Sequence, residues 1–379
     1  MTHTGPGAGG HAPRRFLVLS ATMGAGHDAV ADELVARLTA RGAQVHRADV
    51  LDLLPAHVGA ALRGFYRATV LHLPPLYAGI YAAFLRPGGA RRTPGPGGLA
   101  GLAERGLAGL VRRERPDLVV PVFHLAAQLT GRMRVRGSLP VPSAVVVTDF
   151  AVHGQWLHPG NDLYCCLTED AAIRVREATG RPAAATGPLV ASRFLAPATS
   201  AGQWHQVFRS RAPDRPVVLL SAGAWGAGSH LADTAALLAR AGFLPVALCG
   251  VNRRLRARLS RVPGTLALGW ERDVPGLMSA ADALVDNAAG QTALEALAMG
   301  LPVVGYRPIP GHGKAGARRM ADLGLTRFAP DPWTLIDVLD GLTRPRRSRD
   351  APSPAVAALF APDTAARLME ACTPDPVTA

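Results

Sequence analysis

Short apolar runs alternate with helical stretches along most of this chain. The apolar runs of the first half lie at 16–20, 44–48, 116–121, 142–148 and 163–167. The same rhythm starts again in the second half, with runs at 216–221, 244–249, 265–268, 283–285 and 303–304. Strands separated by helices are typical of βαβ units with parallel sheets. The pattern therefore predicts an α/β protein with two Rossmann-like domains that face a central cleft.

Breaks in this alternation predict the domain boundaries. The Gly/His-rich start lacks an apolar segment of the kind found in signal peptides and is expected to be a disordered tail. The predicted divisions are a tail at 1–13, an N-terminal domain at 14–196, a linker at 197–214, a C-terminal domain at 215–345 and a tail with a helix at 346–379.

Residues 285–304 predict a strand end, a tight loop, a helix and a second strand. Gly290 allows the backbone to approach a ligand closely, and the free N–H groups at the helix start favour a phosphate. Glu295 lies one turn into this helix, within reach of a ribose next to the phosphates. An ordinary βαβ turn has the same pattern, so this stretch alone leaves both interpretations open.

In each half, one Gly-rich loop follows the first strand. Gly24 and Gly26 precede His27, which the pattern places at the start of a helix. This position lies at the carboxyl edge of the sheet, where α/β proteins bind their ligands. A capping or surface histidine is the alternative. In the second half, Gly223 and Gly226 form the corresponding loop.

The segment 49–98 breaks the α/β rhythm and combines apolar, aromatic and basic residues. Its aromatic and basic candidates for contact with an acceptor or a membrane are Tyr77, Tyr81, Arg86, Arg91 and Arg92. Such a combination suits a helix or loop at an anionic membrane interface. A buried helical hairpin with a disordered connection is equally compatible with the pattern.

The formal net charge of +13 favours anionic partners. No helix-turn-helix, zinc-finger or RNA-binding signature is present, so we expect no nucleic-acid partner. The spacing of the four cysteines matches no disulfide framework, and no apolar run reaches the length of a transmembrane helix. The cluster Asp149, His153, Trp156 and His158 could suggest a metal site, but the histidine spacing is irregular and only one carboxylate lies near, so we expect no metal.

Several segments together resemble the monogalactosyldiacylglycerol synthase and processive diacylglycerol glucosyltransferase family. The segments that carry the resemblance are 20–27 (SATMGAGH), 51–84, Pro116-Asp117, Thr148-Asp149-Phe150, Gly187-Pro188-Leu189-Val190 and 282–311. The resemblance implies a GT-B fold in which the C-terminal half binds a UDP-sugar. It also implies a metal-independent, inverting transfer of a hexose to a lipid hydroxyl, with no cofactor, by a cytoplasmic protein peripheral on the inner face of the cell membrane.

The resemblance also assigns roles to individual residues. His27 becomes the candidate base, and Asp149 orients it or contacts the acceptor. Gly24 and Gly26 would lie on the acceptor side. The implied donor-binding residues are Gly223, Gly226, Gly290, Gln291, Thr292, Glu295, Gly311 and His312.

The chain departs from its relatives at three places. Gly24-Ala25-Gly26-His27 stands where relatives carry Gly-Gly-Gly-His, and Phe123-His124 stands near their Ser-Thr-His-Pro. The relatives' donor-sugar contacts, Gln-Glu and then Asn, are replaced by His312, Gly313 and Gly316. Three hypotheses follow: a lipid glycosyltransferase, a glycosyltransferase with a non-lipid acceptor, or a nucleotide-sugar-binding protein without turnover.

Overall fold

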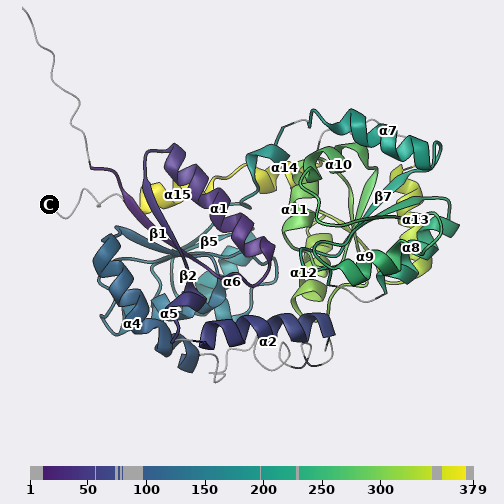
Figure 1. Ribbon diagram of the computed structural model, residues 1–379. Helices are drawn as coiled ribbons and strands as arrows, with labels where there is room; N and C mark the ends of the chain where they lie inside the picture. Colours follow the sequence, from purple (N-terminus) through teal and green to yellow (C-terminus); the bar gives the residue numbers. More distant parts are fainter. Residues whose placement is uncertain are drawn as a thin grey trace, which may run out of the picture.

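The computed structural model describes residues 12–55, 57–72, 76, 79, 97–196, 198–227, 230–343 and 352–372. Two halves lie side by side, and each is built on a layer of parallel strands covered by helices (Figure 1). The prediction of an α/β protein with two Rossmann-like units is confirmed.

The first half contains two three-stranded sheets that meet edge to edge. Its strands are β1 (Arg15–Ser20), β2 (Gln44–Asp49), β3 (Leu118–Pro121), β4 (Ala144–Val146), β5 (Leu163–Cys166) and β6 (Ala183–Ala185). The strand orders are β2-β1-β3 and β4-β5-β6, and a parallel bridge between Val119 and Ser143 joins the two sheets. The helices are α1 (Ala25–Ala40), α2 (Val58–His72), α4 (Gly97–Glu114), α5 (His124–Val135) and α6 (Glu169–Thr179).

The second half has one six-stranded parallel sheet with the order β12-β11-β10-β7-β8-β9. Its strands are β7 (Val217–Ser221), β8 (Leu244–Leu248), β9 (Leu266–Leu268), β10 (Ala283–Asp286), β11 (Val303–Tyr306) and β12 (Arg327–Ala329). Its helices are α7 (Ala201–Arg211), α8 (Leu231–Arg240), α9 (Arg253–Leu259), α10 (Val274–Ala280), α11 (Gln291–Ala298), α12 (His312–Asp322) and α13 (Pro332–Thr343).

The apolar runs form strands because both faces of each sheet are covered. In β1, Phe16 and Val18 pack in one cluster with Leu34 of α1, whereas Leu17 and Leu19 pack in another with α4 and α5. Successive side chains of a strand point to opposite faces, so a continuous apolar run fits a strand buried on both sides. Each fully buried side chain of this size contributes about 1.5–3 kcal/mol.

Several elements differ from the sequence-based expectations. The sequence pattern predicts helix starts at about Asp28 and at Ala315, but α1 and α12 begin three residues earlier, at Ala25 and His312. Their first turns contain glycine and are therefore not distinguishable from a loop in the sequence. The strands β6 and β12 were missed, since three residues at a sheet edge carry no alternation. Helix α7 occupies most of the predicted linker and packs on α10, where Trp204 Nε1 donates to Asp273 Oδ2 at 2.9 Å.

The C-terminal segment forms two helices where one was predicted, α14 (Pro354–Phe360) and α15 (Thr364–Ala371). Pro362 interrupts the helical pattern, and Asp363 caps α15 by accepting from two backbone N–H groups. Helix α14 contacts α11 of the second half, whereas α15 packs on α1 of the first half (Figure 1). Thr364 Oγ1 donates to the Thr186 carbonyl at 3.1 Å, so this segment ties the halves together.

Loops at the carboxyl ends of the strands are the usual position of ligands in such folds, above all where the strand order reverses. These reversals lie between β1 and β3 in the first half and between β7 and β10 in the second. The loop carrying His27 follows β1, and the loops carrying Gly223 and Gly290 follow β7 and β10.

Candidate active site

His27 lies in the first turn of α1, directly after the loop that follows β1. Gly24 caps this helix with a φ of 125°. Residues with a Cβ rarely adopt this angle, so the backbone requires glycine at this position even though a Cβ would meet nothing within 4 Å. The turn thus places His27 at the carboxyl edge of the first sheet.

Neighbouring groups act on the imidazole of His27 in opposite directions. Its ring packs edge-on against Phe123, with 5.0 Å between centroids and 83° between planes. Burial lowers the pKa of His27 below its ordinary value of 6.5, and this effect outweighs the charge of Asp149 and the Val122 carbonyl, which raise it. A neutral imidazole near pH 7 can accept a proton.

Asp149 follows β4 and is fixed by two nitrogen atoms at one of its oxygens. Trp156 Nε1 donates to Asp149 Oδ2 at 2.9 Å, and His153 Nε2 lies 3.3 Å from the same oxygen. Both Trp156 and His153 are buried. The carboxylate is therefore held in one position, near enough for its charge to favour a protonated His27.

Aromatic rings pack around this carboxylate. The His124 ring centroid lies 4.1 Å from that of Phe123, 5.3 Å from that of His153 and 6.0 Å from that of Trp156. A continuous row of rings thus leads from His27 to Trp156. Because each ring limits the rotation of its neighbour, the row holds His27 and Asp149 in a defined arrangement.

The N-terminus of α11 offers an anion site. Gly290 caps the helix without a side-chain hydrogen bond, and a Cβ at Gly290 would meet nothing within 4 Å. The N–H groups of Gln291 and Thr292, at the first two helical positions, have no acceptor within the helix. Asp286 Oδ2 accepts from the N–H groups of Ala288 at 2.9 Å and Ala289 at 2.6 Å, which fixes the preceding loop. Open space, free donors and the helix dipole together suit a phosphate.

Glu295 lies one turn beyond this N-terminus. Burial raises its pKa to about 7, and the charge of Arg193 acts in the opposite direction. Arg193 belongs to a 3₁₀ helix at Ser192–Phe194, at the end of the first half. A carboxyl group so placed can accept hydrogen bonds from ribose hydroxyls when ionised.

The two candidate regions face each other across the boundary between the halves. A Cβ built on Gly26 would lie 3.7 Å from the Cβ of Gln291, so the first turns of α1 and α11 are in near contact. Gln291 Nε2 donates to the Leu189 carbonyl of the first half at 3.0 Å. The side chain of Gln291 therefore joins the halves, and only its backbone N–H remains for a ligand.

The Gly-rich loop after β7 has a fixed shape. Gly223 and Gly226 both have a φ of 63°. A Cβ on Gly226 would lie 2.4 Å from the Cβ of Asn252 and 2.6 Å from the Cys249 carbonyl oxygen, so no larger residue fits. Asn287 Nδ2 donates to the Ala227 carbonyl at 3.3 Å, which connects this loop to the loop before α11.

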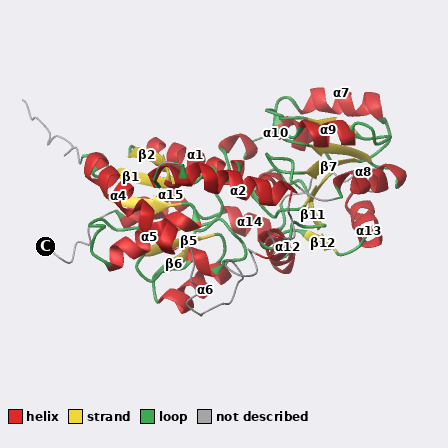
Figure 2. Ribbon diagram, turned by 60° about the horizontal axis from the view of Figure 1, so that its bottom comes forward, coloured by secondary structure: helices red, strands yellow, loops and turns green. Residues whose placement is uncertain are grey.

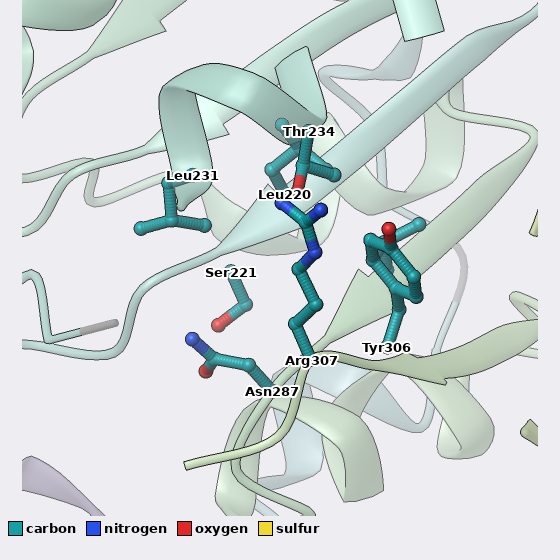
Figure 3. Close-up of a pocket in the computed structure, with 8 residues that line it drawn as sticks. Leu220, Ser221, Leu231, Thr234, Asn287, Tyr306 and Arg307 are labelled. Atoms are coloured by element: carbon teal, nitrogen blue, oxygen red, sulfur yellow. The ribbon is translucent and has the colours of Figure 1, made fainter. Parts of the chain in front are cut away.

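A small pocket opens where the strand order of the second sheet reverses. Figure 3 shows its lining, which comes from β7, α8, β10, β11 and the loops that follow the strands. Asn287 Oδ1 is buried there without a hydrogen-bond partner, and the guanidinium of Arg307 lies 5.1 Å from the centroid of the Tyr306 ring. Asn287 belongs both to this pocket and to the loop before α11, so the two features adjoin.

The start of α12 packs closely on the loop before α11. Gly311 caps α12 with a φ of 90°. A Cβ on Gly313 would lie 3.1 Å from the Asn287 carbonyl oxygen, and one on Gly316 would lie 3.0 Å from the Cβ of Ala289. The glycines therefore allow the close approach of α12, and larger side chains there would displace it. The side chain of His312 lies outside the described residues.

The predicted acceptor and membrane residues Tyr77, Tyr81, Arg86, Arg91 and Arg92 also lie outside the described residues. The helix before them, α2, is described and has a largely exposed surface, on which Phe65 is 53% exposed. In the described part of the chain, every helix is too short or too polar to span a membrane.

The histidines after β4 have separate structural roles. His158 Nδ1 accepts from the Gly160 N–H at 3.0 Å, and the imidazole ring packs against Gly131. Over the described ranges, no three His, Cys, Asp or Glu residues are grouped in a way that could hold a metal ion.

Sequence reasoning missed several contributors to the site. Asp286 could have been found, because an acidic residue at a strand end often accepts from the N–H groups of the following turn. His153 and Trp156 were noted only as part of a metal pattern. Arg193 carries no local signal, and the motif that contains Leu189 does not reveal its partner. Each of the two meets its partner on α11 about one hundred residues further along the chain.

Solved structures define the class of this fold. The chain superposes on the structure of TcCGT1 in complex with UDP with a TM-score of 0.60 at 12% identity, covering 95% of this chain and 98% of that one. It superposes on Acinetobacter baumannii MurG with a TM-score of 0.56 at 17% identity, covering 95% and 99%. The fold is therefore that of the GT-B glycosyltransferases.

Sequence comparisons identify the family that the chain resembles. The family model for monogalactosyldiacylglycerol (MGDG) synthase matches residues 27–188. The processive diacylglycerol beta-glucosyltransferase of Bacillus licheniformis is 27% identical over 223 residues, and the match spans 57% of each chain. The chain thus spans little more than half the length of this relative. The resemblance predicted from the sequence is confirmed.

Proposed function

We propose that this protein is an inverting glycosyltransferase that moves a hexose from a UDP-sugar to a hydroxyl of diacylglycerol or a related lipid. The observation that carries the proposal is the near contact of Gly26 with Gln291. It brings the first turn of α1, with its neutral imidazole, beside the N-terminus of α11, with its free N–H groups. The family match and the diacylglycerol glucosyltransferase relatives support this assignment.

The donor binds mainly to the second half. The backbone N–H groups of Gln291 and Thr292 hold the diphosphate in the open space beside Gly290, and Glu295 accepts from the ribose hydroxyls. The helix N-terminus supplies partial positive charge to the departing diphosphate. No cofactor takes part in this scheme, and the UDP-sugar is a substrate.

His27 removes the proton of the acceptor hydroxyl. As the hydroxyl oxygen forms its bond to the anomeric carbon, the bond from that carbon to the phosphate oxygen breaks and UDP leaves. The proton goes to the imidazole of His27, and the fixed carboxylate of Asp149 stabilises the imidazolium. This division of roles is that of a base oriented by a neighbouring carboxylate.

The acceptor reaches the site from the membrane. The exposed α2, the basic residues that follow it in the sequence and the net charge of +13 all favour contact with an anionic surface. We therefore place the protein on the inner face of the cell membrane, as a peripheral protein.

Nucleotide-sugar binding without turnover is the second candidate. It is favoured by the close packing of Gly313 and Gly316 on the loop 287–289, because these two positions have no side chain with which to contact the donor sugar. In that case UDP binds, but no donor is cleaved.

A panel of UDP-sugars incubated with diacylglycerol vesicles tests these candidates. The proposal predicts release of UDP from at least one donor, dependent on the vesicles, with formation of a glycolipid. UDP release that requires a water-soluble acceptor would contradict the lipid assignment. UDP binding in calorimetry without release from any donor would favour the second candidate.

A further inference from the structure

We propose that the Gly-rich loop 223–227 after β7 contributes to the donor site and that Trp225 is its positioning residue, held across the boundary between the halves by Tyr66 and Arg67 of α2. The inference rests on the proposed function, because it concerns binding of the UDP portion of the donor. It adds that α2, on the acceptor side, controls how well the donor loop is ordered.

The contact itself joins residues of different halves. The rings of Tyr66 and Trp225 lie with centroids 6.0 Å apart and planes at 63°. The guanidinium carbon of Arg67 lies 5.9 Å from the centroid of the Trp225 ring. Edge-to-face rings and a cation near an aromatic ring both attract one another at these distances. Trp225 is therefore contacted by two consecutive residues of one helix.

Helix α2 is anchored to the first half at its beginning. A Cβ on Gly59 would lie 2.1 Å from the Leu51 carbonyl oxygen, so the helix starts in direct contact with the preceding turn. Arg63 Nη2 reaches Asp49 Oδ2 at 3.1 Å. Beyond this point the helix extends towards the second half (Figures 1 and 2). Tyr66 and Arg67 lie on this extended part, so the position of Trp225 depends on the position of α2.

The loop that presents Trp225 is connected to the donor site by hydrogen bonds. The Gly226 N–H donates to the Gly223 carbonyl at 3.0 Å, which closes a tight turn around Trp225. Directly after this turn, the carbonyl of Ala227 accepts from Asn287 Nδ2 at 3.3 Å. The carbonyl of Asn287 in turn accepts from the Ile309 N–H at 2.7 Å. A displacement of Trp225 would therefore shift the loop before α11 and the loop before α12 as well.

Loss of the contacts of Trp225 with Tyr66 and Arg67 is expected to weaken UDP binding, while the rate of the transfer step stays unchanged. Without the Trp225 ring, the loop 223–227 keeps its internal hydrogen bonds but loses its contact with α2, so its position relative to the first half must be fixed when the donor binds. Loss of the ring pair and of the cation–ring contact together corresponds to an increase of about tenfold in the Kd for UDP. The donor KM should rise by the same factor, whereas kcat at saturating donor should stay within about threefold.

The test is a double-mutant cycle on the full-length chain with UDP as the probe. Wild type, Trp225→Ala, Tyr66→Ala and the double variant are compared by isothermal titration calorimetry. Trp225→Ala, which removes both contacts, should bind UDP about tenfold more weakly, and Tyr66→Ala, which removes the ring pair alone, about threefold more weakly. The double variant should be no weaker than Trp225→Ala. Trp225→Phe, which keeps a ring, should recover most of the affinity. Trp333→Ala, which removes an 85% exposed ring from α13, is the matched control.

Three results would overturn the inference. Unchanged UDP affinity in Trp225→Ala would show that the ring does not position the loop. Additive losses in the double variant would show that Tyr66 and Trp225 act independently. Should Trp225→Ala fail to fold, Tyr66→Ala, at a half-buried position of α2, decides alone, and wild-type UDP affinity in that variant refutes the inference. Failure of the wild type to bind UDP would instead refute the proposed function, and this inference with it.

Discussion

The substitution Glu295→Gln is predicted to stabilise the fold while it weakens donor binding. Glu295 is partly buried on α11, and burial raises its pKa from the ordinary value of 4.5 to about 7. The folded state therefore binds the proton more tightly than the unfolded state. The stability contributed by the protonated group is fully present below pH 4.5 and is lost as the pH rises through about 7.

The magnitude follows from the two pKa values. At about 1.4 kcal/mol for each pH unit, the full interval corresponds to about 3 kcal/mol. Because the side chain keeps some contact with solvent, about 2 kcal/mol is the expected effect at pH 8. Glutamine has the same shape but no charge to desolvate. The free energy of unfolding of Glu295→Gln should exceed that of wild type by about 2 kcal/mol at pH 8 and by less than about 1 kcal/mol at pH 5.

Urea unfolding followed by circular dichroism at pH 5 and pH 8 measures this difference. Glu177→Gln, which removes an exposed carboxyl group from α6, is the matched control and should change the unfolding free energy by less than about 0.5 kcal/mol at either pH. If Glu295→Gln is less stable than wild type at pH 8, the carboxylate is stabilised by Arg193 and the argument from burial is wrong.

The same substitution should impair donor binding. Ribose hydroxyls donate to an ionised carboxylate, so binding of UDP near pH 6 should release a proton from Glu295. Calorimetry in two buffers of different ionisation enthalpy measures this release. Glu295→Gln should abolish the proton release and weaken UDP binding by roughly tenfold or more. Proton release that persists in the variant would show that another group titrates.

The remaining predictions concern two glycines and one tryptophan. Gly226→Ala should lower the free energy of unfolding by about 2–4 kcal/mol, because the new Cβ meets Asn252 and the φ is positive; urea unfolding measures it. Gly290→Ala should change the thermal midpoint by no more than about 1 °C but weaken UDP binding at least about tenfold in calorimetry, since its Cβ enters space open only to the ligand. Trp156→Phe should lower kcat by about tenfold without changing UDP affinity, because Asp149 loses its indole donor; steady-state kinetics at saturating donor would contradict this if kcat is unchanged.

The fold was largely predictable because its signals are local. Strands such as β1 and β7 are continuous apolar runs, and both faces of their sheets are covered as such runs require. Helix starts at Ala25 and His312 were misplaced, since glycines in a first turn have the same appearance as a loop. The edge strand β12 has only three residues and no alternation to reveal it.

The site was predictable only in part, because its geometry depends on contacts distant in sequence. His27 and the α11 N-terminus could be proposed from motifs, and the structure adds that Gly26 and Gln291 face each other. The assignment of Gln291 to the donor missed its side-chain bond to Leu189, which lies 102 residues away. The contact of Trp225 with Tyr66 likewise has no local pattern.

The central claim is that His27 acts as the base beside a UDP site, and one comparison tests it most directly. Glycolipid formation and UDP affinity are measured for His27→Ala and for His205→Ala, which removes an exposed imidazole from α7. The account predicts that His27→Ala lowers kcat by about a thousandfold while UDP affinity stays within about threefold of wild type, with His205→Ala unchanged. Full turnover by His27→Ala would contradict the account.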